Sequence, residues 1–434
     1  MPGREKQKNM DFKFDLEFAK ELDRKDPLQA YRKEFLFPQH KGREVVYLTG
    51  NSLGLQPRKA KEALQQELND WEKFGVEGHF EAKNPWLSYH EMFAEPLARL
   101  VGAKPSEVVA MNGLTTNLHL MMASFYRPTE QRFKIICEAK AFPSDLYALE
   151  SQARHHNLDP EKTIIALEPR KDEHTIRTED VLTAIEQVGS ELALVMIGGV
   201  NYYTGQVFDM ETITKAGHAV GAMIGWDLAH AAGNIPLRLH DWAVDFACWC
   251  SYKYLNSGPG SVSGVFVNEK HCANKDLPRF AGWWGHDKET RFLMEKGFNP
   301  MPTAESWQLS NAPVFSMAVH KVALDLHDEV GMEKLREKSI LLTAYLEFVI
   351  HEVSRQSAKS YFEIITPSNP KERGSQLSIL AHGLGKSLFD KLAESGVIAD
   401  WREPNVIRIA PVPMYNSFED CFRFGETLSS ATQT

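Results

Sequence analysis

The feature that most constrains the fold is a series of short apolar segments that alternate with helical segments between about residues 86 and 310. Seven of these segments are predicted as strands: Val108–Met111, Phe133–Cys137, Thr163–Leu167, Leu192–Gly198, Ala222–Asp227, Phe246–Cys250 and Gly264–Val267. Each is apolar along nearly its whole length, which is typical of strands that are covered on both faces. The alternation therefore predicts an α/β domain with a mostly parallel sheet.

The flanking regions predict smaller units. A helix is expected at 10–35, a strand at Arg43–Leu48, a helix from Pro57 to about Phe74, and a long helical region from Pro313 to about Val353, interrupted near Gly331. After it, strands are predicted at Phe362–Thr366, Gln376–Ala381, Val397–Asp400 and Val406–Ile409, and helices at about 386–395 and 417–431. We expect an N-terminal segment (1–55) that packs with the small domain, a large domain (56–312), and a linking helix with a small α+β C-terminal domain (313–434).

Composition excludes several classes of partner. The 434 residues suffice for two domains, and the 49 basic and 58 acidic residues are interspersed, so we expect neither nucleic acid nor an anionic membrane surface as a partner. No apolar run approaches the roughly 18 residues of a membrane span, and the opening nine residues contain no apolar leader. Five cysteines in apolar contexts, without partners at zinc spacing, predict reduced thiols in a cytoplasmic protein and no metal site.

Two strand ends carry complementary charged groups. Lys253 follows the strand at 246–250 in a Ser-Tyr-Lys turn, and Asp227 ends the strand at 222–227. An amine and a carboxylate in these places suit pyridoxal phosphate (PLP). The lysine bonds to the aldehyde of the cofactor, and the carboxylate keeps the pyridine nitrogen protonated so that the ring accepts electrons.

Two more strand ends carry residues suited to the same cofactor. After the strand at 108–111, Gly113 makes a turn, and Thr115 or Thr116 opens a helix whose N-terminus would bind phosphate. After the strand at 133–137, Phe142 would stack on the pyridine ring. Taken singly, these segments, and Asp227 with His230, are better explained by helix caps and core packing than by a cofactor site. Their occurrence in order, each after a strand of one sheet, favours a PLP site.

The same segments resemble the kynureninase family, PLP-dependent hydrolases of tryptophan degradation, from about residue 44 to the C-terminal helix. The matching segments are Gly50–Gly54, Asn112–His119, Phe142–Asp145, Tyr203–Gln206, Asp227–His230, Asp241–Asn256, Gly282–His286 and Arg408–Phe418. The resemblance implies the fold-type I PLP-dependent transferase fold, an α/β fold with a large domain and a small α+β C-terminal domain.

The resemblance also implies roles for individual residues. The residues expected to be catalytic are Lys253, Tyr252 and Asp227, with Tyr252 as a proton donor. Those expected to bind PLP are Leu114, Thr115, Phe142, Pro143, Ser144, Asp145, Asp227, His230, Tyr252, Lys253, Trp283 and Asn311. Those expected to bind the substrate are Asn51, Ser52, His79, Asn311 and Arg408. Arg408 would grip the substrate α-carboxylate with its planar fork of donors. Trp283 and Asn311 are expected from the neighbouring subunit, which implies a homodimer with shared active sites.

One position departs from the family. Gly198 stands where the family usually has Ser or Thr, so a side-chain hydroxyl contact to the cofactor is missing and only backbone could act there.

Other PLP-fold functions fit the residues less well. A cysteine desulfurase-like lyase usually has His before the lysine, where this chain has Tyr252, and a nucleophilic cysteine on a later loop. No cysteine lies between Cys272 and Cys421. An aminotransferase side activity is compatible with the same residues, whereas a non-catalytic PLP-fold binding protein would normally lack the lysine or the acid.

The reaction implied by the resemblance is hydrolysis of the Cβ–Cγ bond of L-kynurenine or 3-hydroxy-L-kynurenine. The products would be L-alanine and anthranilate or 3-hydroxyanthranilate, in tryptophan catabolism or NAD biosynthesis. His79 and Asn311 resemble the branch of the family found in animals, in which polar groups face the aromatic ring of the substrate. We therefore expect a preference for the 3-hydroxy substrate.

Overall fold

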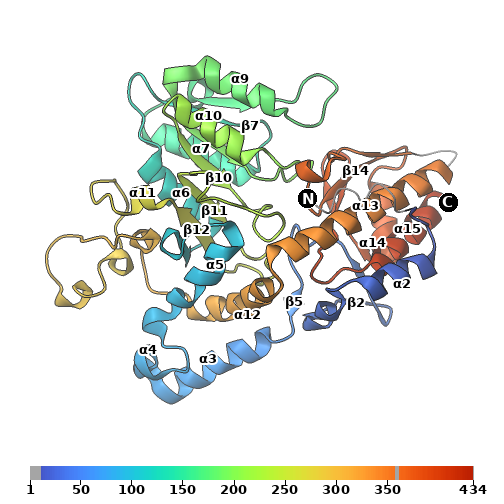
Figure 1. The fold of residues 1–434 in the computed structure, drawn as a ribbon, viewed down its shortest axis with the longest axis horizontal. Helices are drawn as coiled ribbons and strands as arrows, with labels where there is room; N and C mark the ends of the chain where they lie inside the picture. Colours follow the sequence, from blue (N-terminus) through green and yellow to red (C-terminus); the bar gives the residue numbers. More distant parts are fainter. Residues whose placement is uncertain (1–10, 357–360, 434) are drawn as a thin grey trace.

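The protein has a larger and a smaller lobe, which the ribbon shows side by side (Figure 1). The computed structural model describes residues 11–356 and 361–433. The opening nine residues, in which we expected no apolar leader, and the first residue of the helix predicted at 10–35 lie outside the described residues.

The larger lobe is built on a sheet of seven strands. These are β6 (Val108–Met111), β7 (Lys134–Glu138), β8 (Ile164–Leu167), β9 (Leu192–Gly198), β10 (Met223–Asp227), β11 (Phe246–Trp249) and β12 (Ser263–Val267). Their order is β6-β12-β11-β10-β9-β7-β8, and only β12 runs antiparallel to its neighbours. The α/β fold with a mostly parallel sheet is therefore confirmed. The carboxyl ends of the other six strands lie at one edge of the sheet, where ligands bind in such folds.

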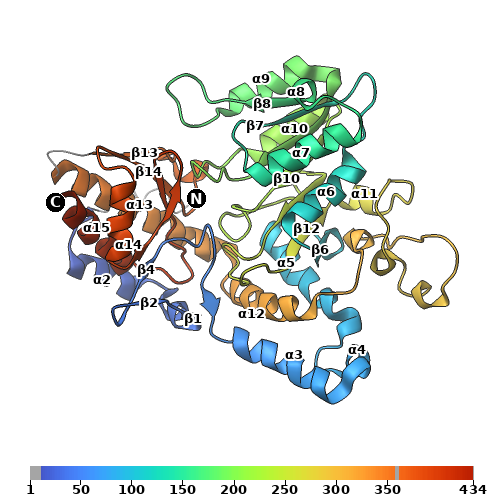
Figure 2. The same ribbon diagram turned by 180° about the vertical axis from the view of Figure 1, so that it is seen from behind.

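Both faces of the sheet are buried, which explains why its strands are apolar throughout. On β9, Val195 and Ile197 belong to one hydrophobic cluster, whereas Leu194 and Met196 belong to another. The helices around the sheet include α5 (Ala94–Val101), α6 (Leu114–Phe125), α7 (Pro143–His155), α9 (Thr178–Val188) and α10 (Met210–Ala219) (Figures 1 and 2). Successive side chains of a strand point to opposite faces, so two covered faces require an unbroken apolar run.

The smaller lobe combines an antiparallel sheet with helices. Its strands are β13 (Tyr361–Ile364), β14 (Leu377–His382), β16 (Asp400–Arg402) and β17 (Val406–Ile409), in the order β13-β14-β17-β16. Its helices are α13 (Met332–Gln356), α14 (Lys386–Glu394) and α15 (Phe418–Gln433), and α12 (Val314–Val330) precedes α13. Gly331, with φ of 81°, separates α12 from α13 at the predicted interruption.

Two sequence predictions for short strands are wrong in detail. The single strand expected at Val397–Asp400 is divided between two sheets, because β15 (Val397–Ile398) pairs with β4 (Val46–Tyr47) and β16 begins at Asp400. The strand expected at Arg43–Leu48 is likewise divided into β3 (Arg43–Glu44) and β4. β4 and β15 are far apart in the sequence, whereas β3 pairs with the neighbouring Gln39–His40 and β16 with the nearby β17, so strand pairing sets the limits of each short segment.

The helix expected at 10–35 is shorter than predicted. It runs as α2 (Leu16–Lys25), whose N-cap Asp15 accepts a hydrogen bond from the Phe18 N–H at 2.9 Å, and a 3₁₀ helix follows at Gln29–Glu34. The break lies at Asp26, which has extended geometry (φ −75°, ψ 114°) and precedes Pro27. Proline disfavours the α conformation of the residue before it, which explains why the helix ends there.

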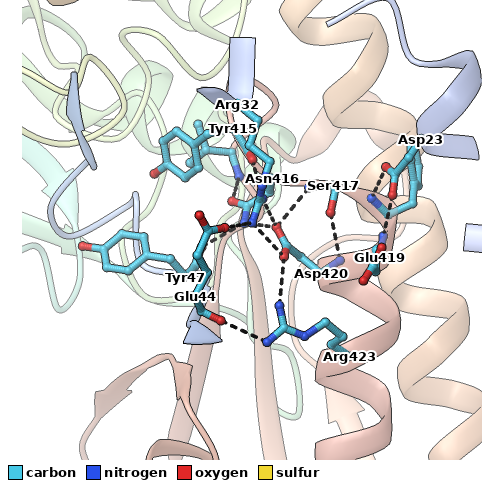
Figure 3. Close-up of polar contacts among 12 residues, drawn as sticks. Asp23, Arg32, Glu44, Tyr47, Tyr415, Asn416, Ser417, Glu419, Asp420 and Arg423 are labelled. Atoms are coloured by element: carbon cyan, nitrogen blue, oxygen red, sulfur yellow. Dashed lines mark hydrogen bonds and ion pairs between the residues drawn. The ribbon is translucent and has the colours of Figure 1, made fainter. Parts of the chain in front are cut away.

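The N-terminal segment is held to the smaller lobe by buried polar contacts (Figure 3). Asp420 on α15 pairs with Arg32 at 2.7 Å. Asp23 on α2 accepts hydrogen bonds from the N–H groups of Phe418 and Glu419 at 2.7 and 3.0 Å, and thereby caps the first turn of α15. These contacts lock the start of the described chain onto its last helix.

Two segments project from the larger lobe on the side remote from the smaller one. They are the hairpin of α3 (Ala60–Phe74) and α4 (Gly78–Glu81), and the long loop at about 273–300 (Figures 1 and 2). Within the described ranges, no helix is long and apolar enough to cross a membrane.

Candidate active site

A cavity of about 240 Å³ lies at the carboxyl edge of the large sheet. The residues predicted for the site that line it are Leu114, Thr115, Phe142, Ser144, Asp145, Asp227, His230, Tyr252 and Lys253. Thr116, the alternative to Thr115, lines it as well. These residues come from the ends of β6, β7, β10 and β11, so the sheet brings together four sequence segments that are far apart in the chain.

Lys253 is hydrogen-bonded to a buried histidine. Its Nζ lies 3.0 Å from Nε2 of His230. Burial lowers the pKa of His230 well below its ordinary value, and the nearby charge of Lys253 lowers it further. His230 is therefore neutral and accepts a hydrogen bond from the lysine, which fixes where the amine points.

Asp227 and Asp145 form a pair of buried carboxyl groups. Burial raises the pKa of Asp145 well above its ordinary range, and the charge of Asp227 raises it further. Burial also raises the pKa of Asp227, but hydrogen bonds from Asp145 and from the Ala229 N–H, at 2.6 Å, act in the opposite direction. Asp145 is therefore the protonated member and donates to Asp227, which keeps the ionised form.

The opposite side of the cavity is suited to a phosphate group. The helix α6 begins at Leu114 after the N-cap Gly113, so its free N–H groups and positive dipole end are at the cavity. The hydroxyl of Thr115 lies 3.3 Å from that of Ser144, and both are acceptable partners for phosphate oxygens. Pro143, predicted to bind the cofactor, is exposed, does not line the cavity, and opens α7 as its N1 residue.

Aromatic side chains complete the cavity. The Phe142 ring centroid is 5.9 Å from the Nζ of Lys253, and the ring packs edge-on against Tyr202 with centroids 5.3 Å apart. Tyr252 is half-buried, and burial raises the pKa of its phenol, so the phenol stays protonated at neutral pH. A protonated phenol in this position can act as a general acid.

These residues fit PLP. Lys253 offers the amine for the aldehyde, Asp227 a buried carboxylate for the pyridine nitrogen, and α6 an N-terminus for the phosphate. Nδ1 of His230 and Oδ1 of Asp145 are buried and have no hydrogen-bond partner among the described residues. Unsatisfied buried polar atoms are costly, so their presence in two cavity-lining residues fits a site that a polar ligand completes.

Arg408 lies beside the cavity and does not line it. Its side chain is 1% exposed, pairs with Asp400, and donates a hydrogen bond to the Tyr202 carbonyl oxygen at 2.5 Å. Gln376 donates to the same carbonyl oxygen and accepts a hydrogen bond from Asn51 at 2.9 Å. This network connects the predicted residues Asn51 and Arg408 with Tyr202 at the cavity. The Nε of Arg408 has no partner within the described chain.

The other predicted residues are not brought to the cavity. Trp283 is 47% exposed, and Asn311 is also exposed. His79 is half-buried and forms no hydrogen bond with the cavity residues in the described chain. Its Nδ1 lies 2.9 Å from the Val76 carbonyl oxygen. Ser52 is half-buried in the turn after Thr49. Within this chain alone, these positions do not complete the site.

Sequence reasoning missed four cavity residues, the apolar Val200 and Ala229 and two with functional groups, Glu138 and Tyr202. Glu138 ends β7 and Tyr202 follows β9, and both line the cavity. Glu138 immediately follows the apolar strand predicted to end at Cys137, so the rule that found Asp227 at a strand end also applies to it. Nothing in the pattern of the Asn201–Gln206 loop distinguishes Tyr202 from an ordinary loop tyrosine.

Comparison with known proteins identifies the family. A family model described as the kynureninase C-terminal domain matches residues 335–428. A kynureninase of Flavobacterium psychrophilum is 59% identical over 419 residues, which cover 96% of this chain and 98% of the relative. One from Nematostella vectensis is 48% identical over 437 aligned residues, covering 96% and 94%.

Solved structures show the same fold in more distant proteins. A cysteine desulfurase from Escherichia coli has a TM-score of 0.75 at 17% identity, covering 94% of this chain and 98% of that one. A cysteine desulfurase from Thermococcus onnurineus has a TM-score of 0.74 at 17% identity, covering 90% and 95%. These likenesses show the fold, whereas the relatives that share nearly the full length at high identity decide the family. The chain belongs to the kynureninase family of PLP-dependent enzymes.

Proposed function

We propose that this enzyme hydrolyses the Cβ–Cγ bond of L-kynurenine and 3-hydroxy-L-kynurenine, in tryptophan catabolism or NAD biosynthesis. The products are L-alanine and anthranilate or 3-hydroxyanthranilate. The observation that carries the proposal is one cavity that combines the Lys253 amine with the proton-sharing pair Asp145 and Asp227. The names of the relatives with nearly full-length similarity indicate the substrate class.

Each cavity residue has a proposed role. PLP, when bound, supplies an aldehyde for a covalent link to an amine and a ring that accepts electrons. Asp227 holds a proton at the ring nitrogen, and Asp145 donates to Asp227 and keeps it oriented. Lys253 would hold the PLP aldehyde and, as a free amine, would move the proton at the substrate α-carbon. Tyr252 gives its phenolic proton to Cβ, a role that its raised pKa allows.

Arg408 is proposed to bind the α-carboxylate of the substrate. Support comes from its guanidinium, which is buried beside the cavity wall at Tyr202 and retains one unpartnered N–H. A planar guanidinium binds a carboxylate through two parallel hydrogen bonds. Asn51 is linked to the same place through Gln376, and Ser52 follows it in the chain, so both are proposed as substrate contacts from the N-terminal segment.

The function is tested by comparing the wild type with Lys253→Ala after reconstitution with PLP. The wild type should show the visible absorbance of lysine-bound PLP and release anthranilate from kynurenine, whereas the variant should lose both. Release of sulfide from cysteine is the control reaction and should be absent in both proteins. A wild type that binds PLP but releases no anthranilate would refute the proposal.

The active enzyme is proposed to be a homodimer with shared sites. Trp283 and Asn311 are exposed, and exposed apolar side chains lie beside them. Phe292 (52% exposed) packs against Trp283 with ring centroids 5.3 Å apart, and Phe280 (56%) precedes Trp283 in the same loop. Trp71 (58%) and Phe315 (40%) share a groove with Ala312, the residue after Asn311. Exposed apolar patches are typical of surfaces that bind another protein. Burying these side chains against a second copy would let Trp283 and Asn311 reach the partner's PLP site.

Mixing two inactive variants tests the shared sites. Lys253→Ala removes the amine from one cavity, and Trp283→Ala removes a residue that should serve the partner's cavity. Hybrid dimers then contain one cavity with both groups intact, so activity should reappear after exchange of subunits. Size-exclusion measurements on each variant provide the control for assembly. Two variants that both form dimers but never restore activity in mixtures would argue against shared sites.

The substrate preference is proposed to favour the 3-hydroxy compound. His79 packs edge-on against Trp86, with centroids 5.5 Å apart, and Trp86 lines the same apolar groove as Ala312, next to Asn311. Both polar groups are therefore on one surface that would face a partner's site. Leaving them unpaired costs roughly 1–3 kcal/mol, which predicts a preference of about 5- to 150-fold in kcat/KM. Competition between the two substrates measures it, and equal kcat/KM values would contradict it.

A cytoplasmic location is proposed from the thiols. All five cysteines are buried and unpaired, which is typical of proteins from a reducing compartment. Imaging a fluorescent fusion in the source cells tests the location.

A further inference from the structure

Glu138 is a buried acid at the cavity that none of the proposed roles uses. It ends β7, is 5% exposed, and lines the cavity beside Asp227 and Gly198. The backbone N–H of Gly198 lies 3.1 and 3.2 Å from its two carboxyl oxygens. A bond from a backbone donor fixes the carboxyl group in place, and the donor is Gly198, where the family resemblance leads us to expect Ser or Thr.

Gly198 makes room for this carboxyl group. A Cβ atom added at Gly198 would lie 2.9 Å from the nearer Glu138 oxygen, so any side chain there would push the carboxyl group aside. In the sheet, β9 lies between β7 and β10, and Gly198 is in register with Asp227. Because Gly198 has no side chain, the Glu138 side chain can extend across β9 toward Asp227, the residue that would hold the pyridine nitrogen.

The surroundings of Glu138 are acidic and apolar. The titratable groups near it are Cys137 on β7, Asp145 on α7, Asp227 on β10 and Tyr202, and the cavity also holds His230 and Lys253. Among the described residues, no ion pair joins Glu138, Asp145 or Asp227 to a cation. Burial raises the pKa of Glu138 to about 7 and Asp227 contributes to the rise, although the Gly198 N–H opposes it.

We propose that Glu138 is a further positioning residue of the PLP site, whose carboxyl group stands in for the hydroxyl missing at Gly198 and loses its proton to solvent when the protonated pyridine ring binds. A positive ring beside Asp227 favours a second carboxylate nearby, because opposite charges stabilise each other most in a buried site. The proton balance is simple: Glu138 gives up one proton, solvent takes it, and no bond to the cofactor is required. Glu138 thereby acts through Asp227 and Gly198 and not on the substrate.

The test is the pH dependence of PLP binding by the full-length wild type and by Glu138→Gln. Glutamine keeps an acceptor for the Gly198 N–H but cannot ionise. Below about pH 7, where Glu138 of the cofactor-free protein holds its proton, PLP affinity should rise with pH more steeply in the wild type than in the variant, by up to about tenfold per pH unit, because one more proton is released. Above about pH 7 the two slopes should converge. Titration of the phosphate and ring is common to both proteins and cancels in the comparison. Calorimetry in buffers of different ionisation enthalpy counts the released protons directly.

Gly198→Ala is the matched second variant and keeps the Glu138 carboxyl group. Its added methyl group displaces that carboxyl group from the neighbourhood of Asp227, so the pH midpoint of PLP binding should move to lower pH. A structural role alone would change affinity equally at every pH. The proposal fails if Glu138→Gln releases as many protons as the wild type. It also fails if Glu138→Gln does not fold and Gly198→Ala leaves the pH profile unchanged.

Discussion

Two buried aspartates at opposite edges of the large sheet have opposite surroundings. Asp245 immediately precedes β11, and Asp227 ends the adjacent strand β10. Asp245 is surrounded by nitrogen donors: the ammonium of Lys270 at 2.7 Å and the imidazoles of His218 and His271, each at 2.8 Å. Asp227 has a backbone N–H and a second carboxyl group instead.

The difference in partners produces opposite shifts in pKa. Burial raises the pKa of Asp245, but hydrogen bonds from His218 and His271 and the charge of Lys270 outweigh it and hold the pKa below its ordinary range. At Asp227 burial prevails, and the counter-charge is left to a ligand. At the amino edge of the sheet, protein groups compensate the buried charge of Asp245. At the carboxyl edge, no protein ion pair in the described chain compensates the buried charge of Asp227. Charge that the fold leaves uncompensated marks the place where chemistry occurs.

Asp227→Asn should break the carboxyl edge without harming the fold. The amide keeps an acceptor for the Ala229 N–H but carries no charge for the pyridine nitrogen. We expect kcat to fall by about 10²–10³, the size typical of a lost preorganised electrostatic contact. Stability toward denaturant should not fall, because the amide removes a buried charge that no ion pair compensates in the described chain. A variant that unfolds more easily but turns over normally would reverse the assignment of the two edges.

The contribution of Glu138 to the free energy of unfolding should fall as the pH rises. Its pKa is raised from 4.5 to about 7, so between these values the folded protein holds a proton that the unfolded chain releases. Stability from this group is therefore present below about pH 4.5 and is lost as pH rises through 7, by up to about 3 kcal/mol. Denaturant unfolding of cofactor-free wild type and Glu138→Gln at pH 5 and pH 8 measures the difference. If the free energies of unfolding of the two proteins differ by the same amount at pH 5 and at pH 8, Glu138 is not a buried acid with a raised pKa.

Asp245→Asn should show the opposite behaviour. The pKa of Asp245 is lowered from 3.8, so its stabilisation is present above that value and is lost as pH falls through the lower folded pKa. At pH 7 the variant should lose on the order of 2 kcal/mol, since the Lys270 and histidine contacts lose their anion while the Ile224 N–H keeps an acceptor. The kinetic constants with saturating PLP should stay at wild-type values. A catalytic defect of similar size would show that the two edges are coupled.

The sequence predicted the large sheet well because its strands are buried on both faces, where local pattern and tertiary environment agree. Its predictions were poorer at β3, β4, β15 and β16, because strand pairing sets the limits of these short segments: β4 pairs with the distant β15, whereas β3 and β16 pair with short neighbouring segments. The helix predicted at 10–35 was too long for a local reason, since Pro27 disfavours helical geometry at Asp26 and α2 therefore ends at Lys25.

The sequence placed Asp227 and Lys253 at or just after strand ends, and the fold brings both to the cavity, whereas their roles there stay predictions. It missed Glu138, which was taken to lie beyond the strand that it ends, and Tyr202, which contributes its ring and a carbonyl oxygen. It could not reveal that Arg408 is already paired with Asp400, because that contact depends on the register of β16 and β17. The charge of Arg408 is thus partly compensated within the protein, less than that of Asp245 and more than that of Asp227.

Arg408→Lys tests that intermediate case and should have the smallest effect. A lysine ammonium would keep the charge next to Asp400, so stability should change little, but it cannot bind a carboxylate as a planar fork. We expect KM for kynurenine to rise by about tenfold, or about 1.4 kcal/mol, while kcat falls by no more than about twofold. Steady-state kinetics on the PLP-saturated enzyme measures both constants, and Arg402→Lys is the matched control because Arg402 pairs with the same Asp400 at 3.0 Å. If KM rises equally in both variants, the loss comes from Asp400 and the carboxylate is bound elsewhere. If only Arg408→Lys is affected, the smaller lobe supplies the guanidinium that binds the substrate carboxylate at the carboxyl edge of the sheet.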